Sequence, residues 1–321
     1  MTVSYTDVRE ASARIAGHVH ITPVMESEQL NRIAGLSLFF KAEHLQKVGA
    51  FKARGAVNAV FSLDKEYLKQ GVTTHSSGNH GAALARAGAL RGGQARIVVP
   101  SDASVVKKAA IAGYGAQIIE CEPTLAARQA ALDKVVAETK AAFIHPYDDE
   151  MIIAGAGTAA LEFVDQVRDL DAMVAPIGGG GLLAGTALVS QAQGIKVFGA
   201  EPMGADDAAR SFRSGKRVLE HVPDTICDGL LTTVGERNWD IVHSIVEDIL
   251  LVSDEETVAA MYLIWSRMKQ IVEPSSAVAL AAIIKYKDLF SGLRVGVILS
   301  GGNVDLAELP FQSSNKVSNL T

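Results

Sequence analysis

Lys52 is the residue whose type and place first suggest chemistry. It lies in the stretch VGAFKARGAVNAV (residues 48–60), between Phe51 and a run of small residues, where a strand gives way to a helical pattern. A lysine in the first turn of a helix is ordinarily a solvated charge. Whether this amine does chemistry therefore depends on the other motifs of the chain.

A run of four glycines, Gly178, Gly179, Gly180 and Gly181, is the strongest local signal. It stands in APIGGGGLLAG, between a buried strand and an apolar helix. Glycines at such a junction let backbone N–H groups turn inward beside a helix N-terminus, which favours a bound phosphate. A tight turn that happens to be rich in glycine is the alternative. The glycine motif of a dinucleotide-binding site follows the first strand, whereas this run lies late in the chain. A P-loop has a lysine after its glycines, and no lysine follows this run.

A second turn before a helix, THSSGNHGAALA, carries hydroxyl, amide and imidazole groups on Ser76, Ser77, Asn79 and His80. Beside free helix N–H donors, these groups suit a carboxylate or a ring hydroxyl. An elaborate helix cap is the competing interpretation. A third turn, ILSGGNVD, ends the last predicted strand with Ser300, and ligands of open parallel sheets bind at this carboxyl edge.

The stretch GAEPMGADDAAR gathers acids in a short segment. Glu201, Asp206 and Asp207 would be solvated loop charges in most proteins. A glutamate, a backbone carbonyl and an aspartate this close together also form a hard oxygen site that suits Mg²⁺, Ca²⁺ or Mn²⁺. Both interpretations stay open on spacing alone.

The elements that must position these motifs follow an α/β pattern. Short apolar runs predict strands of a parallel sheet covered on both faces: LSLFFKAE, ARIVVP, AQIIEC, AAFIHP, AMVAPIG, KVFGAEP and RVGVILSGG. Alanine-rich segments between them predict crossover helices: residues 78–91, 103–115, 124–140 and 254–272. Strand-helix alternations within residues 71–148 predict a small mobile domain, inserted into a large domain of residues 1–70 and 149–321.

Composition narrows the class of protein. The 321 residues are 48% hydrophobic and 21% charged, as in an ordinary soluble globular protein. A net charge of −6 without lysine or arginine clusters argues against a nucleic-acid partner. The acidic first residues and the lack of a long apolar stretch predict a cytoplasmic protein with no membrane partner. Cys121 and Cys227, far apart in sequence, do not suggest a disulfide framework.

Seven motifs, in order, resemble those of the fold type II pyridoxal-phosphate enzymes: GAFKARGAVNAV, SSGNHGAALA, PIGGGGLLAG, AEPMGADDA, TICDGL, VEPSSAVALAA and LSGGNVD. They are most similar to the serine racemase and serine/threonine dehydratase branch, which includes the 3-hydroxyaspartate ammonia-lyases. The resemblance implies a tryptophan synthase beta-like α/β fold, with an open parallel sheet in the large domain and a smaller inserted α/β domain. It also implies pyridoxal 5'-phosphate as cofactor and a homodimer.

The resemblance assigns cofactor contacts position by position. Lys52 matches the lysine that binds the cofactor covalently and acts as a base, so a desolvated site should lower its pKa. Other positions match residues that contact the cofactor: Phe51 beside the ring, Asn79 at the ring hydroxyl, Gly178 to Gly181 at the phosphate and Ser300 at the pyridine nitrogen. Ala50 stands where relatives commonly carry a serine. Alanine has no hydroxyl group, so it cannot make the contact near the lysine that a serine could make.

Substrate and metal contacts follow from the same resemblance. The substrate loop comprises Ser76, Ser77, Gly78, Asn79 and His80. Ser77 matches the second acid or base of racemising relatives, although a role in carboxylate binding competes with this. Arg128 matches an arginine of relatives that handle dicarboxylates, or is an exposed helix charge. The implied metal ligands are Glu201, the carbonyl of Ala205 and Asp207.

These residues lead to a ranked set of functions. First is an ammonia-lyase (dehydratase) that eliminates water from a β-hydroxy amino acid, with 3-hydroxyaspartate giving oxaloacetate and ammonia. The rival is a serine racemase with serine/threonine dehydratase activity. A non-catalytic binding protein that keeps the fold is the alternative from another class. Retention of Lys52, the glycine run and Ser300 together argues against it.

Overall fold

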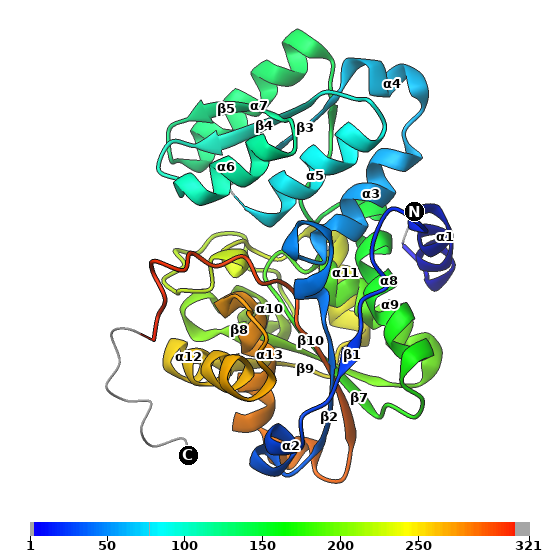
Figure 1. Ribbon diagram of the computed structural model, residues 1–321, viewed down its shortest axis with the longest axis vertical. Coiled ribbons are helices and arrows are strands. Elements are labelled where there is room, and N and C mark those ends of the chain that lie inside the picture. The colour runs from blue at the N-terminus through cyan, green and yellow to red at the C-terminus, as the bar shows by residue number, and fades with distance from the viewer. Residues whose placement is uncertain (1–2, 77, 312–321) are drawn as a thin grey trace.

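A computed structural model describes residues 3–76 and 78–311 of the chain. Two α/β units are stacked end to end, one on a six-stranded sheet and the other on a four-stranded sheet (Figure 1). Within these residues, no helix combines the length and apolar character needed to cross a bilayer. Cys121 and Cys227 are both free, as the sequence suggested.

The six-stranded sheet contains four strands that the apolar runs predicted and two that they did not. Its strands lie in the order β1 (Val24–Met25), β2 (Ser37–Lys41), β10 (Arg294–Ile298), β7 (Ala172–Pro176), β8 (Lys196–Pro202) and β9 (Asp248–Val252). The strands β2, β7, β8 and β10 lie in predicted apolar runs, whereas β1 and β9 were not predicted. Every neighbouring pair is parallel except β1 and β2, so the predicted parallel sheet has one short antiparallel edge. Alternate residues of β7 face opposite layers: Val174 packs toward α12 and α13, whereas Met173 packs toward α8 and α9.

The four-stranded sheet is parallel throughout. Its order is β5 (Gln117–Cys121), β4 (Ala95–Pro100), β3 (Val72–His75) and β6 (Ala142–Phe143), with helices α5 (Asn79–Leu90), α6 (Val105–Gly113) and α7 (Leu125–Thr139) packed on it. This unit uses residues that lie inside the predicted range 71–148. The exact domain boundaries and the mobility of the unit remain predictions.

The other helices belong to the large unit or to the junction. Their bounds are α1 (Tyr5–Ile15), α2 (Glu28–Ala34), α3 (Lys52–Ser62), α4 (Lys65–Gln70), α8 (Glu150–Gln166), α9 (Gly181–Gln193), α10 (Asp207–Ser214), α11 (Glu236–Ile245), α12 (Asp254–Leu263) and α13 (Pro274–Lys285). Single turns of 3-10 helix are η1 (Glu43–Leu45), η2 (Lys47–Gly49), η3 (Met203–Ala205), η4 (Asp228–Leu230) and η6 (Lys287–Phe290), and η5 (Ile264–Met268) is a π-helix.

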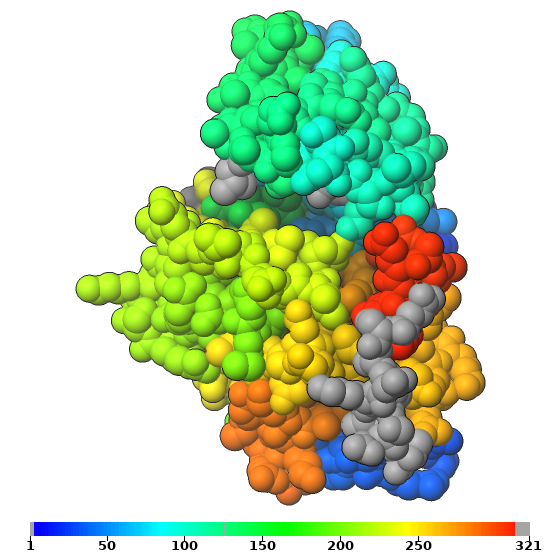
Figure 2. Space-filling model, turned by 90° about the vertical axis from the view of Figure 1, so that its left-hand side faces the viewer, coloured from blue at the N-terminus to red at the C-terminus, as the bar shows by residue number. Residues whose placement is uncertain are grey.

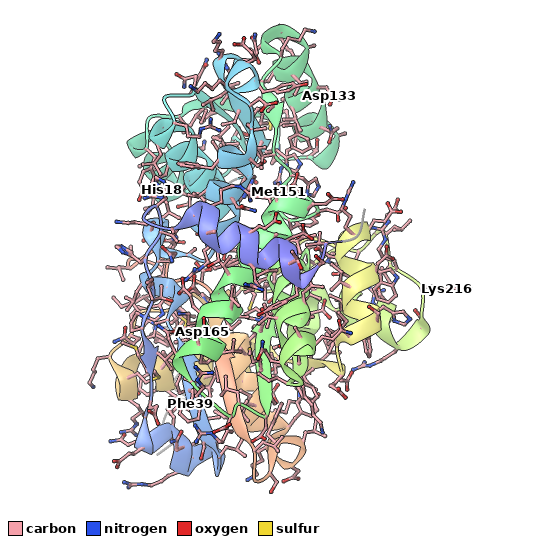
Figure 3. All side chains as sticks on the ribbon, turned by 90° about the vertical axis from the view of Figure 1, so that its right-hand side faces the viewer. His18, Phe39, Asp133, Met151, Asp165 and Lys216 are labelled. Carbon is pink, nitrogen blue, oxygen red and sulfur yellow. The ribbon has the colours of Figure 1, made fainter. Side chains whose placement is uncertain are left out.

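Helices α3 and α8 join the two units. A Cβ on Gly155 would lie 2.6 Å from the Cα of Gly55, so only glycine lets these helices approach so closely. The Asn58 side chain donates a hydrogen bond to the carbonyl of Met151 across the same contact. Figure 3 shows Met151 at this junction, with α1 lying across the outside. The junction places the first turn of α3, and with it Lys52, between the two sheets.

The predicted helix over residues 254–272 is only partly correct. The helix α12 begins with a capping box at Ser253 and ends at Leu263, after which the π-helix runs to Met268. Lys269 has a φ of 59°, a left-handed conformation that ends a helix. The indole N–H of Trp265 donates to the carbonyl of Val272, which fixes the chain in its new direction.

A furrow separates the two units on one side of the molecule (Figure 2). One ion pair crosses from the small unit to the large unit, between Lys107 of α6 and Asp228 of η4. Both side chains are partly exposed, so we expect a modest energetic contribution from the pair. It is one of the contacts between the two units.

Candidate active site

Lys52 begins α3 at the carboxyl end of the large sheet. The N–H of Phe51 donates to the carbonyl of Ser300 at 3.0 Å, which ties the lysine segment to the end of β10. The lysine Nζ donates to the carbonyl of Pro146 at 2.8 Å and lies 5.2 Å from the centroid of the Phe51 ring. Burial lowers the pKa of the amine to about 8, and the nearby Glu273 carboxylate opposes this shift. Lys52 can therefore act as a nucleophile or base near neutral pH.

The glycine run connects β7 to α9, next to the end of β10. Tight packing requires glycine here, because a Cβ would lie 2.8 Å from the Cα of Leu230 at position 178 and 2.3 Å from the Tyr147 ring at position 179. Gly180 has a φ of 93°, which side-chain-bearing residues rarely adopt. The local conformation thus explains why the sequence places glycines at these positions.

The peptide after Gly179 is held in one orientation. Its carbonyl accepts hydrogen bonds from the Asn238 side chain at 2.7 Å and from the N–H of Gly235 at 3.0 Å. Because a trans peptide points its C=O and N–H in opposite directions, the N–H of Gly180 faces away from Asn238. Within residues 3–76 and 78–311, the N–H groups of Gly178 to Gly180 have no protein acceptor. These donors, at the N-terminus of α9, suit an anion such as a phosphate.

The second predicted loop lies between β3 and α5. The Ser76 hydroxyl accepts hydrogen bonds from the N–H groups of Gly78 at 3.3 Å and Gly81 at 3.1 Å. Burial, followed by the charge of Lys52, holds the pKa of His80 well below its usual range, so this imidazole is neutral. Ser77, predicted as a second acid or base, lies outside the described residues.

Asn79 and Ser300 both lie near the lysine segment, because a Cβ on Gly301, next to Ser300, would be 3.2 Å from the Asn79 Nδ2. Asn79, the first residue of α5, donates to both carboxyl oxygens of Glu273, at 3.0 and 3.2 Å. Ser300 is buried directly after β10 and accepts the N–H of Phe51 through its carbonyl. The fold thus brings Phe51, Lys52, Asn79 and Ser300 together from three separate segments. Their roles toward a cofactor stay predictions.

Arg128 lies near the carboxyl ends of β3 and β5. Burial, followed by the charge of Arg128, lowers the pKa of His75, the last residue of β3. Burial raises the pKa of Cys121, the last residue of β5, and Arg128 opposes that shift. The Nε of Arg128 is buried without a hydrogen-bond partner, and no carboxylate of the described residues pairs with the guanidinium. Arg128 is therefore an uncompensated cation close to the loop that begins at Ser76.

Two of the predicted metal ligands, Glu201 and Asp207, lie close together at the N-terminus of α10. The Glu201 carboxylate accepts hydrogen bonds from the N–H groups of Ala208 at 2.9 Å and Ala209 at 2.8 Å. Asp207 accepts one from the N–H of Val234, whereas its Oδ1 has no hydrogen bond and lies 3.6 Å from the His221 Nε2. Burial raises the pKa of both carboxyls, and for Glu201 the charge of Asp207 adds to this.

Two buried carboxylates with one unpartnered oxygen fit a divalent cation. The described residues contain no cluster of three or more His, Cys, Asp or Glu side chains suited to a metal. The predicted set instead combines Glu201 and Asp207 with the carbonyl of Ala205 in η3. The imidazole of His221, 3.6 Å from the Asp207 Oδ1, is the structural alternative to a metal. The metal site therefore stays a prediction.

Sequence reasoning assigned no role to four residues that hold the site. Tyr147 packs on Gly179, Asn238 binds the glycine run, and Glu273 and Asn303 contact Asn79. Glu273 and Asn303 occur in the motifs VEPSSAVALAA and LSGGNVD, so their presence was visible. Their contacts were not, because each partner lies in a distant part of the chain.

Comparisons with known proteins show which proteins this chain resembles. The family model described as "Pyridoxal-phosphate dependent enzyme" matches residues 15–301. Serine racemase of Dictyostelium discoideum is 49% identical over 96% of this chain and 97% of its own length. The crystal structure of that protein superposes with a TM-score of 0.91 and covers 95% of this chain and 100% of the other chain. Beta-hydroxyaspartate dehydratase of Paracoccus denitrificans is 48% identical over 96% of this chain and 98% of its own length. The structure of a pyridoxal 5'-phosphate-dependent aspartate racemase, 36% identical, superposes with a TM-score of 0.92 over 96% of this chain and 98% of that chain.

Proposed function

Because the chain belongs to the family of pyridoxal-phosphate dependent enzymes, we propose that it is an ammonia-lyase that eliminates water from a β-hydroxy amino acid and releases a 2-oxo acid and ammonia. The favoured substrate is 3-hydroxyaspartate, with oxaloacetate as the product. The relative named beta-hydroxyaspartate dehydratase supports this assignment through 48% identity over nearly its whole length. The unpaired Arg128 near the substrate loop is the structural observation that carries the choice of substrate.

The residues of the site fit pyridoxal 5'-phosphate. The free N–H groups of the glycine run would hold its phosphate, and Lys52 would bind its aldehyde carbon beside the Phe51 ring. Asn79 would face the ring hydroxyl, and Ser300 the pyridine nitrogen. When bound, the cofactor supplies an electron-accepting ring that stabilises negative charge at the substrate Cα.

Lys52 is placed to move the reacting proton. An amine with a pKa of about 8 takes up and releases a proton near neutral pH, so Lys52 can remove the hydrogen on the substrate Cα. The loop that starts at Ser76 would bind the α-carboxylate at the N-terminus of α5 and orient that hydrogen. The hydroxyl of Ser300 is a weaker acid than a carboxyl group and would not donate a proton to the pyridine nitrogen. This favours elimination of the β-hydroxyl.

Arg128 favours a substrate with a second carboxylate. A guanidinium binds a carboxylate through two parallel N–H donors, and Arg128 has no such partner among the described residues. Serine and threonine carry nothing for this group, whereas 3-hydroxyaspartate carries a distal carboxylate. The aspartate racemase among the structural relatives is named for a dicarboxylic substrate, which is consistent with such a contact in this fold.

Serine racemase with serine/threonine dehydratase activity is the second candidate. The Dictyostelium relative of that name is 49% identical, so overall similarity does not separate the two functions. A panel of the hydroxyaspartate isomers, serine and threonine separates them, assayed for 2-oxo acid release and for D-isomer formation. Faster oxaloacetate release from a hydroxyaspartate isomer than any turnover of serine or threonine is the expected result. Preference for serine or threonine would leave only the racemase or dehydratase.

We also propose that Glu201, the carbonyl of Ala205 and Asp207 bind a divalent cation, Mg²⁺, Mn²⁺ or Ca²⁺. Removal of the ion is expected to lower the thermal midpoint of unfolding by a few degrees, because ligand binding stabilises the folded state by mass action. Thermal unfolding after EDTA treatment measures this effect, and added Mg²⁺ or Mn²⁺ should reverse it.

The replacement Asp207→Asn should abolish the response to chelator, whereas Asp240→Asn on the neighbouring α11 should leave it intact. Metal analysis of the treated protein makes the result decisive. An unchanged midpoint and unchanged activity, after the metal content has fallen, would mean that these acids only cap α10.

Capture of pyridoxal phosphate by the apoprotein is expected to become faster with rising pH and to level off above about 8. Only a neutral amine attacks an aldehyde, and burial lowers the pKa of Lys52 from 10.5 to about 8. Protonation below that pH removes the nucleophile, so the rate should fall about tenfold per pH unit. Stopped-flow absorbance at a series of pH values gives the profile. A midpoint near 10.5 would mean that Lys52 is an ordinary solvated lysine.

The family resemblance also supports a cytoplasmic homodimer, which we include in the proposal. Exposed apolar side chains of Ile21, Leu45 and Ile271 favour such an assembly. They belong to adjacent segments, because Gln46 exchanges two hydrogen bonds with the backbone of His20 and His44 contacts Gln270. Leu45, one residue of this surface, lies in η1, and the chain continues from there through η2 to Lys52.

A further inference from the structure

Glu273 is a buried glutamate at the N-terminus of α13. It precedes α13 and is 4% exposed, yet its side chain makes no capping hydrogen bond to the helix. Among the described residues no lysine or arginine forms an ion pair with it. Burial, followed by the charge of Asp228, raises its pKa to about 7. An unpaired buried carboxyl is costly, so a purely structural role does not explain it.

The carboxyl group points instead to Asn79. It accepts hydrogen bonds from the Asn79 Nδ2, at 3.0 and 3.2 Å, and from the N–H of Asn303 at 3.2 Å. The Asn303 side chain then donates to the Asn79 Oδ1 at 2.8 Å and to the carbonyl of Val48 at 2.8 Å. Both ends of the Asn79 amide are therefore held by partners from other segments.

Only one orientation of the Asn79 amide satisfies these contacts. A flipped amide would place Oδ1 against the carboxyl oxygens of Glu273 and would place two donors, the amide groups of Asn79 and Asn303, against each other. The carboxyl group accepts at the Nδ2 end of the amide while Asn303 donates to the Oδ1 end, so the two partners select the same orientation. A neutral apolar side chain at position 273 would remove the acceptor for the Nδ2 end.

The same contacts fix the backbone around the amide. The N–H of Glu273 donates to the carbonyl of Gly301, and a Cβ on Gly301 would lie 2.5 Å from the Glu273 Oε1. Val48, which receives the second Asn303 hydrogen bond, has a φ of 59°, a costly conformation for a β-branched residue. Strain is kept only where surrounding contacts impose it. Three segments, around Val48, Asn79 and Gly301, therefore meet at Glu273.

We propose that Glu273 is a positioning residue that holds the Asn79 amide in the single orientation in which it contacts the cofactor ring. The inference rests on the proposed function, because it takes Asn79 as the residue facing the ring hydroxyl. Glu273 acts through Asn79 and not on the reacting atoms. Its removal must therefore have no further effect once Asn79 has been removed.

A double-mutant cycle on pyridoxal 5'-phosphate binding tests this. Glu273→Gln keeps the size of the side chain but leaves one acceptor oxygen for two donors, so the dissociation constant of the cofactor from the apoprotein, measured by fluorescence, should rise about tenfold. In the Asn79→Ala background the same change should matter less than about twofold. The visible absorption maximum of the loaded protein should shift alike in both single variants. Asp288→Asn, an exposed acid beyond α13, is the matched control and should change neither readout.

The outcomes separate this inference from the proposed function. Equal losses in the two backgrounds, or an unshifted absorption band in Glu273→Gln, would overturn the positioning role while leaving cofactor binding intact. Failure of the wild-type protein to bind the cofactor would instead overturn the proposed function. If Glu273→Gln does not fold, as judged by circular dichroism of the apoprotein, Asn303→Ala supplies the same cycle, because it removes the other partner of Asn79.

Discussion

Replacing Lys52 with alanine is expected to lower the rate of 2-oxo acid release by at least about a thousandfold, below detection in an ordinary assay. The variant loses both the covalent anchor for the cofactor and the base that takes the α-proton. Cofactor can still bind through the glycine run and Asn79, so the affinity should fall less than the rate. Coupled assay of oxaloacetate and the visible spectrum of the variant measure the two effects separately.

The fold of the Lys52→Ala variant should be intact. The Lys52 amine makes one hydrogen bond, to the carbonyl of Pro146, and contributes no ion pair to the described part of the molecule. A buried cation with a lowered pKa is a cost to the folded state, so its removal should not destabilise the apoprotein below pH 8. Lys65→Ala, on the exposed surface of α4, is the matched control. Undiminished turnover by Lys52→Ala would end the proposed mechanism.

The sign of that stability argument follows from linkage. The folded-state pKa of Lys52 is about 8 and the ordinary value is 10.5, so the unfolded chain binds more protons between these values. Stability of the wild-type apoprotein therefore rises with pH through this window because of Lys52. The alanine variant should lack this rise, which thermal unfolding from pH 7 to 10 can detect. This readout does not depend on cofactor or activity.

The local sequence was sufficient to predict the parts of the site that are formed by one continuous segment. The glycine run was identified from its own residues, and at Gly178, Gly179 and Gly180 the structure shows that a Cβ would lie less than 3.0 Å from a neighbouring atom. Several strands made of continuous apolar residues were also identified, and β8 spans the predicted residues 196–202, although β9, which reads DILLV, was missed. In both cases the physical constraint acts on neighbouring residues.

Elements that depend on distant partners were missed. The strand β3 reads VTTH, and its buried threonines Thr73 and Thr74 interrupt the apolar pattern that identified other strands. The end of the π-helix that follows α12 depends on a left-handed Lys269, for which the helical pattern gave no signal. Glu273 looked like an ordinary first residue before a helix, because only the folded chain brings Asn79 to it.

The Arg128→Ala variant decides the substrate. Loss of a charge-assisted, two-pronged contact costs about 2–3 kcal/mol, so kcat/KM for 3-hydroxyaspartate should fall roughly thirty- to a hundredfold. Turnover of serine or threonine should change by no more than a few fold, because neither carries a distal carboxylate. Steady-state kinetics with each substrate measures the difference. Arg128→Lys, which keeps the charge but loses the fork of donors, should fall between the wild type and the alanine variant.

The pattern across substrates identifies what Arg128 does. An exposed arginine of α1, Arg9, offers a control for loss of one positive charge, and Arg9→Ala should leave every rate unchanged. Equal losses on hydroxyaspartate, serine and threonine would mean that Arg128 supports closure of the small unit over the furrow, since closure serves all substrates alike. A selective loss is expected only if the guanidinium meets the distal carboxylate. The charge of Arg128 also contributes to the lowered pKa of His75, so its removal should raise that pKa even without substrate. An NMR titration of His75 would test whether the guanidinium lies close to the end of β3, beside the loop that begins at Ser76.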